Sequence, residues 1–417
     1  MQGKMNNFIK ITEGEKVALI DPKGKVCLGV SKRLADNLDS HQVQKKIYPI
    51  WKKQMEFVKQ IEEKREKINT AYLMVTRRCN MNCDFCAMNA NDGMRLEREL
   101  KPTDIKSKVI PFFQRNKPHK LIITGGEPLI KDEIVGIIKA LKTGVSCFIT
   151  LQSNGLVITP QLIEELRGNI DEIDFSTKHM FGSSEREKQL TDNIEMCQNA
   201  GIKVLLSFIY EGINESDLFK MIDIAAKYDT GVLFNIVAPV GRAKEKSSIL
   251  TDADHVNMNL KIAKYFLSQG YENKKMSRGL YQRIQVRSSC GGYGKVMAIF
   301  PEGDIYMCQC MEKRQVKMGN ILTDSAEIIL HNLEELLSET EIKKLFCVEY
   351  KEICKDCDYR YICGGKCMVA EEPYDYECIF TKAMLKYVLF YHNTEADKKK
   401  QLENYIKYLE KIRDAKK

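Results

Sequence analysis

From about residue 70 to 240, short runs rich in apolar residues alternate with longer stretches in which apolar residues recur at helical spacing. This alternation is typical of βα units around a parallel sheet. The predicted strands span 71–76, 120–124, 147–153, 172–177, 203–210 and 232–239. The predicted helices span 103–115, 131–141, 185–200 and 216–227. The pattern predicts an α/β fold, a partial (β/α)6 barrel, whose chemistry lies at the C-terminal ends of the strands.

Different patterns flank the barrel. Residues 17–28 read as two short strands joined by a Pro-Lys-Gly turn, and charged, helical residues follow to about Lys67. Residues 281–378 are rich in cysteine and include a second hairpin signal over 297–306. In the tail, apolar residues at helical spacing predict an amphipathic helix that docks on the body: Leu402, Tyr405, Ile406, Leu409 and Ile412.

These boundaries divide the chain into four predicted regions. They are a small α+β N-terminal element over 1–69, the partial barrel over 70–275, a cysteine-rich domain over 276–392 and a C-terminal helix over 393–417. A chain of 417 residues is long enough for two or three domains.

Composition and charge narrow the class of protein. The net charge of +8 is modest, and lysines are spread among acidic residues, so nucleic acid is not implied, although an acidic peptide partner is compatible. No apolar run reaches the ~18 residues needed to cross a bilayer. Met1 to Lys16 is polar and lacks the apolar core of a signal peptide, so we expect a cytoplasmic, soluble protein.

Cysteine usage indicates metal binding. Of the 15 cysteines, 12 fall within 79–86 and 290–378. In a reducing compartment such clusters favour metal ligands over disulfides. The other three, Cys27, Cys147 and Cys197, stand singly in apolar surroundings, and we expect them to be small buried hydrophobic residues.

Three cysteines with CxxxCxxC spacing follow the first predicted strand: Cys79, Cys83 and Cys86. Thiolates are soft ligands that select iron–sulfur clusters or zinc. A four-iron cluster held by only three cysteines leaves one iron open for another ligand. The spacing therefore points to a reaction at that iron.

The triplet, with Phe85 just before its third cysteine, resembles the radical SAM family. The resemblance implies that Cys79, Cys83 and Cys86 hold a [4Fe-4S] cluster whose open iron binds the amino and carboxylate groups of S-adenosylmethionine. Reduction would then split the sulfonium into methionine and a 5′-deoxyadenosyl radical. In this scheme the cofactor breaks the difficult bond, and the protein supplies position and shielding.

Further matches lie at the ends of later strands. Gly125-Gly126-Glu127 resembles the GGE motif that receives the methionine ammonium, and glycine suits a site where backbone approaches a ligand closely. The turn at Ser153-Asn154-Gly155 resembles the family's (T/S)NG turn. The resemblance implies these cofactor-binding residues: Phe85, Gly125, Gly126, Glu127, Ser153, Asn154, Ser176 and Asn235.

The chain departs from the family after the fourth strand. Related enzymes often read Ser-x-Asp-Gly where this chain has Ser176-Thr177-Lys178-His179. We expect Lys178 and His179 to be surface residues, and substrate contact is the alternative. No catalytic base is predicted, because none of the six histidines stands in a convincing constellation, and His119 is expected to be structural.

The second cysteine tract resembles the seven-cysteine pattern of the SPASM subfamily, and Pro239-Val240-Gly241-Arg242-Ala243 resembles its PxGRA segment. The resemblance spans 70 to about 385 and implies two auxiliary [4Fe-4S] clusters. The ligands would be Cys290, Cys308 and Cys367 for the first, and Cys354, Cys357, Cys363 and Cys378 for the second. The first set lacks a fourth cysteine. Cys310 or Cys347 could complete it, or the open site could bind a substrate thiolate; zinc is the alternative for the CxxC pairs.

SPASM enzymes mostly modify peptides or proteins. The hairpin over 17–28 resembles the front of a PqqD-like recognition element, where a leader peptide adds a strand to a sheet edge; a structural brace on the barrel is the alternative. The leading hypothesis is maturation of a ribosomally made precursor peptide (RiPP) by hydrogen abstraction and an intramolecular cross-link. A cysteine thioether is the most economical product, and a carbon–carbon link is its near neighbour. A flavodoxin or ferredoxin would supply electrons.

Two other functions stay open. A sulfatase-maturase-like enzyme would oxidise a cysteine or serine of a protein to formylglycine with the same cluster architecture. A non-catalytic iron–sulfur or zinc scaffold is the alternative of another class, and the intact triplet and Gly125-Gly126-Glu127 argue against it.

Overall fold

A computed structural model describes residues 8–63, 68–94, 96–237, 239–245, 251–281, 283–369 and 376–415. Its centre is a curved sheet in which the six predicted barrel strands run parallel and pair in chain order. They are β4 (Thr70–Met74), β5 (Lys120–Thr124), β6 (Phe148–Ser153), β7 (Glu172–Ser176), β8 (Lys203–Tyr210) and β9 (Gly231–Ile236). The predicted partial barrel is thereby confirmed.

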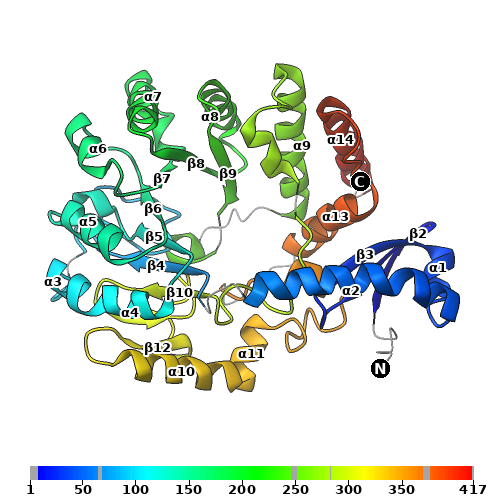
Figure 1. Ribbon diagram of the computed structural model, residues 1–417. Coiled ribbons are helices and arrows are strands. Elements are labelled where there is room, and N and C mark those ends of the chain that lie inside the picture. Colours follow the sequence, from blue (N-terminus) through cyan, green and yellow to red (C-terminus); the bar gives the residue numbers. More distant parts are fainter. Residues whose placement is uncertain are drawn as a thin grey trace.

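Helices cover the outer face of this sheet (Figure 1). They are α3 (Pro102–Asp104), α4 (Ile110–Asn116), α5 (Ile134–Gly144), α6 (Pro160–Leu166), α7 (Ser184–Asn199), α8 (Glu215–Lys227) and α9 (Asp252–Gln269). A π-helical turn, η1 (Ile105–Val109), divides the first predicted helix. Short 3-10 turns are η2 (Pro128–Ile130), η3 (Lys178–Met180), η4 (Gly241–Glu245), η5 (Lys275–Leu280) and η6 (Arg314–Val316).

Alternation along each strand decides what faces the barrel interior. In β7, Ile173 and Phe175 are fully buried against the helices, whereas Asp174 between them points the other way, into the barrel. Apolar side chains therefore form the outer core, and polar ones line the interior.

The cysteine-rich region continues the same sheet. Its strand β10 (Val296–Ile299) pairs parallel to β4, and β11 (Asp304–Tyr306) and β12 (Lys317–Asn320) follow antiparallel. Because β11 runs opposite to β10, the chain leaving it toward Cys308 returns toward the N-terminal ends of the barrel strands. The helices α10 (Ala326–Ser338), α11 (Thr340–Phe346) and α12 (Arg360–Cys363) complete this region.

The N-terminal element is a separate three-stranded antiparallel sheet with two helices. It contains β1 (Ile9–Glu13), β2 (Lys16–Asp21), β3 (Val26–Ser31), α1 (Lys32–Asp36) and α2 (His41–Glu63), so the predicted hairpin gains a third strand. One face packs against α2, and the other packs against the second cysteine tract. The alternative of a brace on the barrel names a different partner from the one observed, because the sheet lies on the cysteine-rich region and on α13 (Tyr376–Phe390).

The tail forms the predicted amphipathic helix, α14 (Lys398–Asp414), which packs on α9. Leu402, Tyr405, Ile406 and Leu409 are buried, as the helical spacing predicts. Within the described ranges, no helix combines the length and the apolar character that a bilayer crossing requires.

Candidate active site

A cavity of about 290 Å³ opens at the C-terminal ends of the barrel strands. Its wall includes all three cysteines of the triplet. It also includes every residue for which the sequence predicts cofactor contact, namely Phe85, Gly125, Gly126, Glu127, Ser153, Asn154, Ser176 and Asn235. Residues from six successive strand ends, more than 150 positions apart in the chain, therefore meet around one space.

The thiols of the triplet lie close enough to influence one another. Burial raises the pKa of Cys79 to about 11, and the charges of Glu127, Cys83 and Cys86 raise it further. Burial also raises the pKa of Cys83, while Arg242 and Lys178 oppose that rise. Cys79 and Cys83 are soft donors that resist ionisation on their own, and such donors are suited to a cationic metal group, which stabilises thiolates directly.

The two glycines of the GGE motif are required by backbone packing. Gly125 has a φ of +142°, and a Cβ on Gly126 would lie 1.9 Å from the carbonyl oxygen of Arg78. The amide of Gly126 donates to the oxygen of Thr76 at 2.8 Å. The close approach observed is thus made to the segment that leads into the triplet, and the predicted approach to a ligand stays a prediction.

Glu127 is buried and ties two strand ends together. Its carboxylate accepts hydrogen bonds from the Ser153 hydroxyl (2.9 Å) and the backbone amides of Asn154 (2.7 Å) and Leu129 (3.1 Å). Burial raises the pKa of Glu127, and these three donors oppose the rise. The Asn154 side chain in turn donates to the Asn80 side chain at 2.7 Å, inside the triplet loop.

Arg242, from the PxGRA segment, holds the triplet loop from the other side. Its guanidinium donates to the carbonyl oxygens of Cys83 (2.6 Å) and Ala90 (2.8 Å), and its backbone amide donates to the carbonyl oxygen of Cys86 (3.0 Å). Gly241 has a φ of +58°, and a Cβ there would lie 2.3 Å from the oxygen of Cys86. The motif is visible in the sequence, but this role is not.

The expectation that Lys178 and His179 are surface residues is wrong. Both line the cavity. The ammonium of Lys178 lies 4.3 Å from the centre of the Phe85 ring and forms an ion pair with Glu211. The His179 ring bonds the carbonyl oxygen of Asn154 at 2.8 Å, and burial lowers its pKa. The turn at η3 folds these side chains inward, which residue type alone does not reveal.

Asp174 is a further cavity residue that motif matching misses. Ser207 and Gln152, on the neighbouring strands, donate to its two carboxylate oxygens at 2.6 and 3.1 Å. The sequence could have indicated this residue, because it is an aspartate at an inward position of a predicted strand. Burying a carboxylate is costly unless it is paired or hydrogen-bonded, so an aspartate at such a position is a candidate for function.

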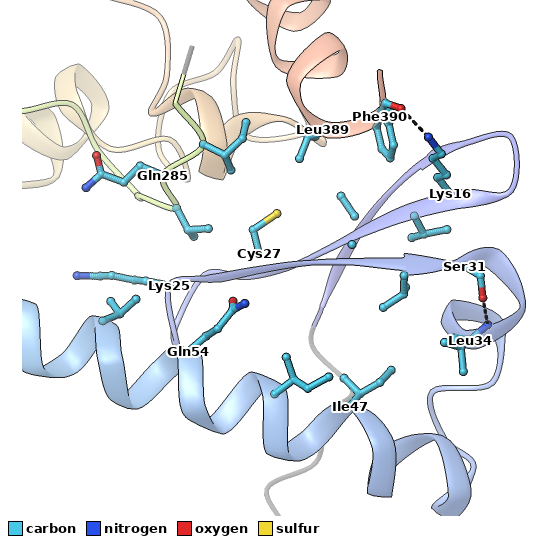
Figure 2. A pocket seen from close by; sticks show the side chains of 18 of the residues that line it. Lys16, Lys25, Cys27, Ser31, Leu34, Ile47, Gln54, Gln285, Leu389 and Phe390 are labelled. Carbon is cyan, nitrogen blue, oxygen red and sulfur yellow. Dashed lines mark hydrogen bonds between the residues drawn. The ribbon is translucent and has the colours of Figure 1, made fainter. Parts of the chain in front are cut away.

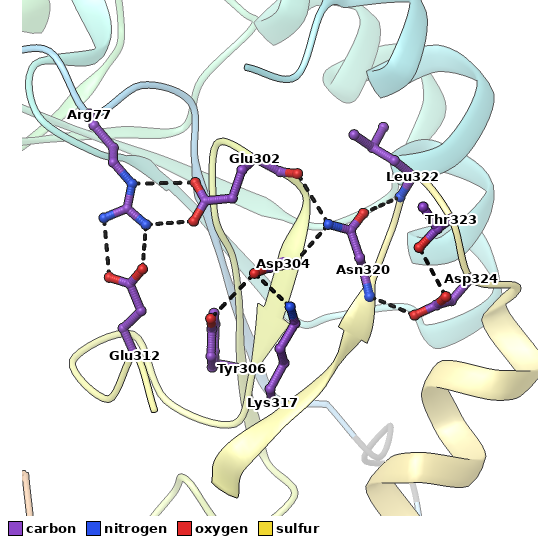
Figure 3. A network of polar contacts seen from close by, with 10 residues as sticks. All are labelled: Arg77, Glu302, Asp304, Tyr306, Glu312, Lys317, Asn320, Leu322, Thr323 and Asp324. Atoms are coloured by element: carbon purple, nitrogen blue, oxygen red, sulfur yellow. Dashed lines mark hydrogen bonds and ion pairs between the residues drawn. The ribbon is translucent and has the colours of Figure 1, made fainter. Parts of the chain in front are cut away.

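Arg77 links the triplet segment to the cysteine-rich region (Figure 3). Its guanidinium bonds the carboxylates of Glu302 and Glu312 and lies 5.2 Å from the centre of the Phe300 ring. Glu302 belongs to the turn between β10 and β11, and Glu312 follows Cys310 by two residues. The loop after β4 and the loop around Cys310 are therefore fixed to one another.

A further cysteine, Cys310, lies near the cysteines predicted for the first auxiliary set. The pKa of Cys308 is raised to about 12, first by burial and then by its neighbours Cys310, Cys367 and Cys290. Cys310 likewise responds to Cys367. Cys347 lies on the side of Cys290, since Ser289 and Cys347 form an isolated bridge. Cys310 thus lies among the predicted ligands, and Cys347 lies near one of them.

The cysteines predicted for the second auxiliary set also lie near one another. Burial raises the pKa of Cys363, and Cys354 and Cys357 raise it further. Cys378, on α13, responds in the same way to Cys354 and Cys363. As the side chains stand in the described ranges, no three His, Cys, Asp or Glu residues converge as a single metal ion would require.

A larger cavity, of about 1020 Å³, follows the outer edge of β3 (Figure 2). On one side α2 presents a stripe of residues: Ile47, Ile50, Gln54, Val58 and Ile61. On the other side lie Ile284 to Val286 and the end of α13 at Leu389 and Phe390. Cys27 points into this space and is half-buried, so it is not the buried core residue that we expected. Cys147 is likewise half-buried and lines another cavity. Cys197 is buried as predicted.

Two protein-family models match the chain. The radical SAM superfamily model matches residues 73–225, and the SPASM model, described as an iron–sulfur cluster-binding domain, matches residues 290–358. The two matches imply S-adenosylmethionine and iron–sulfur clusters as cofactors.

Individual relatives are distant. A GTP 3′,8-cyclase of Clostridium perfringens is 23% identical over 71% of this chain and 96% of its own length. Streptococcus suis SuiB bound to its precursor peptide SuiA matches 87% of this chain and 94% of its own, with a TM-score of 0.58 and 14% identity. The enzyme anSMEcpe with bound AdoMet matches 81% of this chain and 99% of its own, with a TM-score of 0.59 and 14% identity. The strand order, the cysteine sets and the two model matches agree, and the chain contains a radical SAM domain followed by a SPASM domain.

Proposed function

We propose that this protein is a radical SAM/SPASM enzyme that modifies a ribosomally made precursor peptide and forms an intramolecular cross-link in it. The observation that carries this proposal is the cavity along the edge of β3 that no strand of the described residues occupies, in a chain that also contains the triplet cavity. An unpaired strand edge beside an apolar helix stripe is suited to an extended peptide, which adds a strand and places alternate side chains in the groove.

The triplet cavity fits the proposed cofactors. Cys79, Cys83 and Cys86 would hold the [4Fe-4S] cluster, and the other cavity residues named above would hold S-adenosylmethionine. When bound and reduced, this pair supplies a radical that takes hydrogen from an unactivated carbon. The chain's own contribution is position: Arg242 fixes the loop of the triplet, and Glu127 fixes the two strand ends beside it.

The groove is suited to a leader peptide. Within the described chain, β3 has β2 on one side and no strand on the other. Gly29 of β3 faces open space, and Ile50 of α2 leaves 56% of its surface exposed. Lys16, Lys25 and Lys46 on the groove wall agree with an acidic leader, although Glu15 and Glu62 also lie there.

The auxiliary sets decide which cross-link is the more economical. An open first set could bind a substrate thiolate and favour a thioether. Cys310 beside Cys308 and Cys367 would fill that position, and a carbon–carbon link then requires no ligand exchange. Both products remove two hydrogens from the peptide. A cytoplasmic location and a flavodoxin or ferredoxin as reductant remain predictions.

The relatives' names give different substrates. A structurally similar enzyme was crystallised with a precursor peptide, which supports a peptide, whereas the distant sequence relative acts on GTP by its name. The groove favours the peptide, because a nucleotide has no peptide backbone that could pair with a strand edge.

The test is an anaerobic incubation of the reconstituted, reduced enzyme with S-adenosylmethionine and each short peptide that is found to be encoded near its gene. The peptide mass is expected to fall by two hydrogens per link, and Cys83→Ala is expected to abolish the change. An unchanged mass would contradict the proposal. Labelling of the product by a carbonyl reagent would instead support formylglycine formation, and consumption of GTP in a parallel incubation that contains it would support a cyclase.

A further inference from the structure

Asp174 is a buried carboxylate that the cofactor assignment does not use. Only 5% of its surface is exposed, and that part lines the triplet cavity. One carboxylate oxygen accepts from Ser207 at 2.6 Å and the other from Gln152 at 3.1 Å. These bonds fix the plane of the carboxylate, and each oxygen retains acceptor capacity for a further donor.

The negative charge of Asp174 has no cationic partner in the described part of the chain. Glu172, the next inward residue of the same strand, pairs with Lys120 at 3.1 Å and accepts from Thr150 at the same distance. The charge of Lys120 is therefore used by Glu172. Burial raises the pKa of Asp174, and Glu172 adds to this rise, while the two hydrogen bonds and the more distant Lys120 oppose it. Of the two carboxylates on the inward face of β7, one is neutralised by Lys120 and the other has no such partner.

Asp174 also lies between the two places where clusters are expected. The triplet follows the C-terminal end of β4, and the chain around Cys308 returns toward the opposite ends of the strands. Asp174 is the middle residue of β7, so it lies at a level between the two ends of the barrel strands. A substrate in the barrel interior would therefore pass beside Asp174.

We infer that Asp174, oriented by Gln152 and Ser207, is an anionic subsite for a basic group of the substrate, an ammonium or a guanidinium. A cation with N–H donors matches both the uncompensated charge and the remaining acceptor positions. A basic group bound to Asp174 would hold the adjacent carbon of the substrate in the triplet cavity. The subsite would select substrates that carry a basic group. Its use in catalysis rests on the proposed function, whereas its binding of a basic group does not.

The test measures binding with small probes, so that it does not depend on any precursor peptide. Nα-acetyl-lysine amide, Nα-acetyl-arginine amide and the neutral Nα-acetyl-norleucine amide are titrated into the holoenzyme with S-adenosylmethionine by anaerobic calorimetry. The basic probes are expected to bind at least about tenfold tighter than the neutral one, as for a desolvated charge pair. Asp174→Asn, which keeps an acceptor for Ser207, is expected to remove that preference.

Two variants separate the charge from the fold. Asp174→Glu retains the charge and is expected to keep a preference for the basic probes. Asp192→Asn removes an equal charge from an exposed ion pair on α7 and is expected to bind as the unaltered enzyme does. Equal binding of basic and neutral probes, no probe binding at all, or an unchanged preference in Asp174→Asn would overturn the inference. None of these outcomes bears on whether a peptide is modified, which the mass measurement decides.

Discussion

The guanidinium Nε of Arg242 lies 2.6 Å from the carbonyl oxygen of Cys83. The two residues are 159 positions apart, one after the last barrel strand and one in the loop after the first. The proposed cluster loop is therefore held by the segment that closes the barrel, and its geometry depends on the complete fold.

Replacing Arg242 by alanine is expected to loosen the triplet loop. The change removes two side-chain hydrogen bonds to the carbonyls of Cys83 and Ala90. Loss of such supporting contacts typically lowers metal affinity by about 10–100-fold. The measurement is the part of the [4Fe-4S] EPR signal that changes on addition of S-adenosylmethionine, after a chelator challenge. Arg98→Ala, at an exposed pair with Asp104, is the control and should leave the signal intact.

Gly126→Ala is expected to destabilise the fold strongly. Its new Cβ would meet the backbone oxygen of Arg78 at 1.9 Å, so a strand end must shift, at a cost of about 2–5 kcal/mol. Gly136→Ala is the matched control on α5, where nothing lies within 4 Å of the new Cβ. That variant should gain about 0.5–1 kcal/mol. Anaerobic thermal unfolding compares the two, and equal stabilities would refute the packing role of Gly126.

These glycines illustrate how much the sequence can predict. The six barrel strands are predictable because their buried apolar residues form short runs between helical periods, and the motif residues are predictable because they follow those runs. The purpose of each residue depends on packing between distant segments. The approach of Gly126 to Arg78 joins the ends of the neighbouring strands β5 and β4, and the bond of Arg242 to Cys83 joins the last barrel strand to the first, so no local pattern contains them.

The residues that prediction misses share one property. Lys178 and Asp174 are charged, and charge alone favours a surface position. The turn at η3 and the inward face of β7 place them in the cavity instead. The inward position of Asp174 can be read from strand alternation, but its lack of a cation depends on Lys120 pairing with Glu172.

His255, on α9, is expected to make stability depend on pH. Burial lowers its folded pKa to about 4, below the ordinary histidine value of 6.5. The unfolded chain therefore binds this proton more readily, so the contribution is present above pH 6.5 and is lost as pH falls toward 4. His255→Phe, beside Phe380, should flatten the fall in unfolding free energy between pH 7 and 5. The exposed His331→Phe should not, and identical slopes for the two variants would contradict the assignment.

Ile50→Glu is expected to weaken leader binding. Ile50 lines the groove beside β3, and a charge there would face an apolar wall. Losing one apolar anchor and burying a charge should cost at least about 1.4 kcal/mol, a tenfold loss of affinity. Phe57→Glu is the matched control, because Phe57 is exposed on the same helix but lies outside the groove. Fluorescence anisotropy of a labelled precursor measures both, and equal losses would place the leader elsewhere.

The most direct test of the account is the origin of the hydrogen that S-adenosylmethionine acquires when it is cleaved. The reduced holoenzyme is incubated anaerobically with a fully deuterated precursor peptide in ordinary water, and the 5′-deoxyadenosine is analysed by mass spectrometry. The account predicts 5′-deoxyadenosine that contains one deuterium, formed together with a cross-linked peptide. Unlabelled 5′-deoxyadenosine beside an unaltered peptide would contradict it.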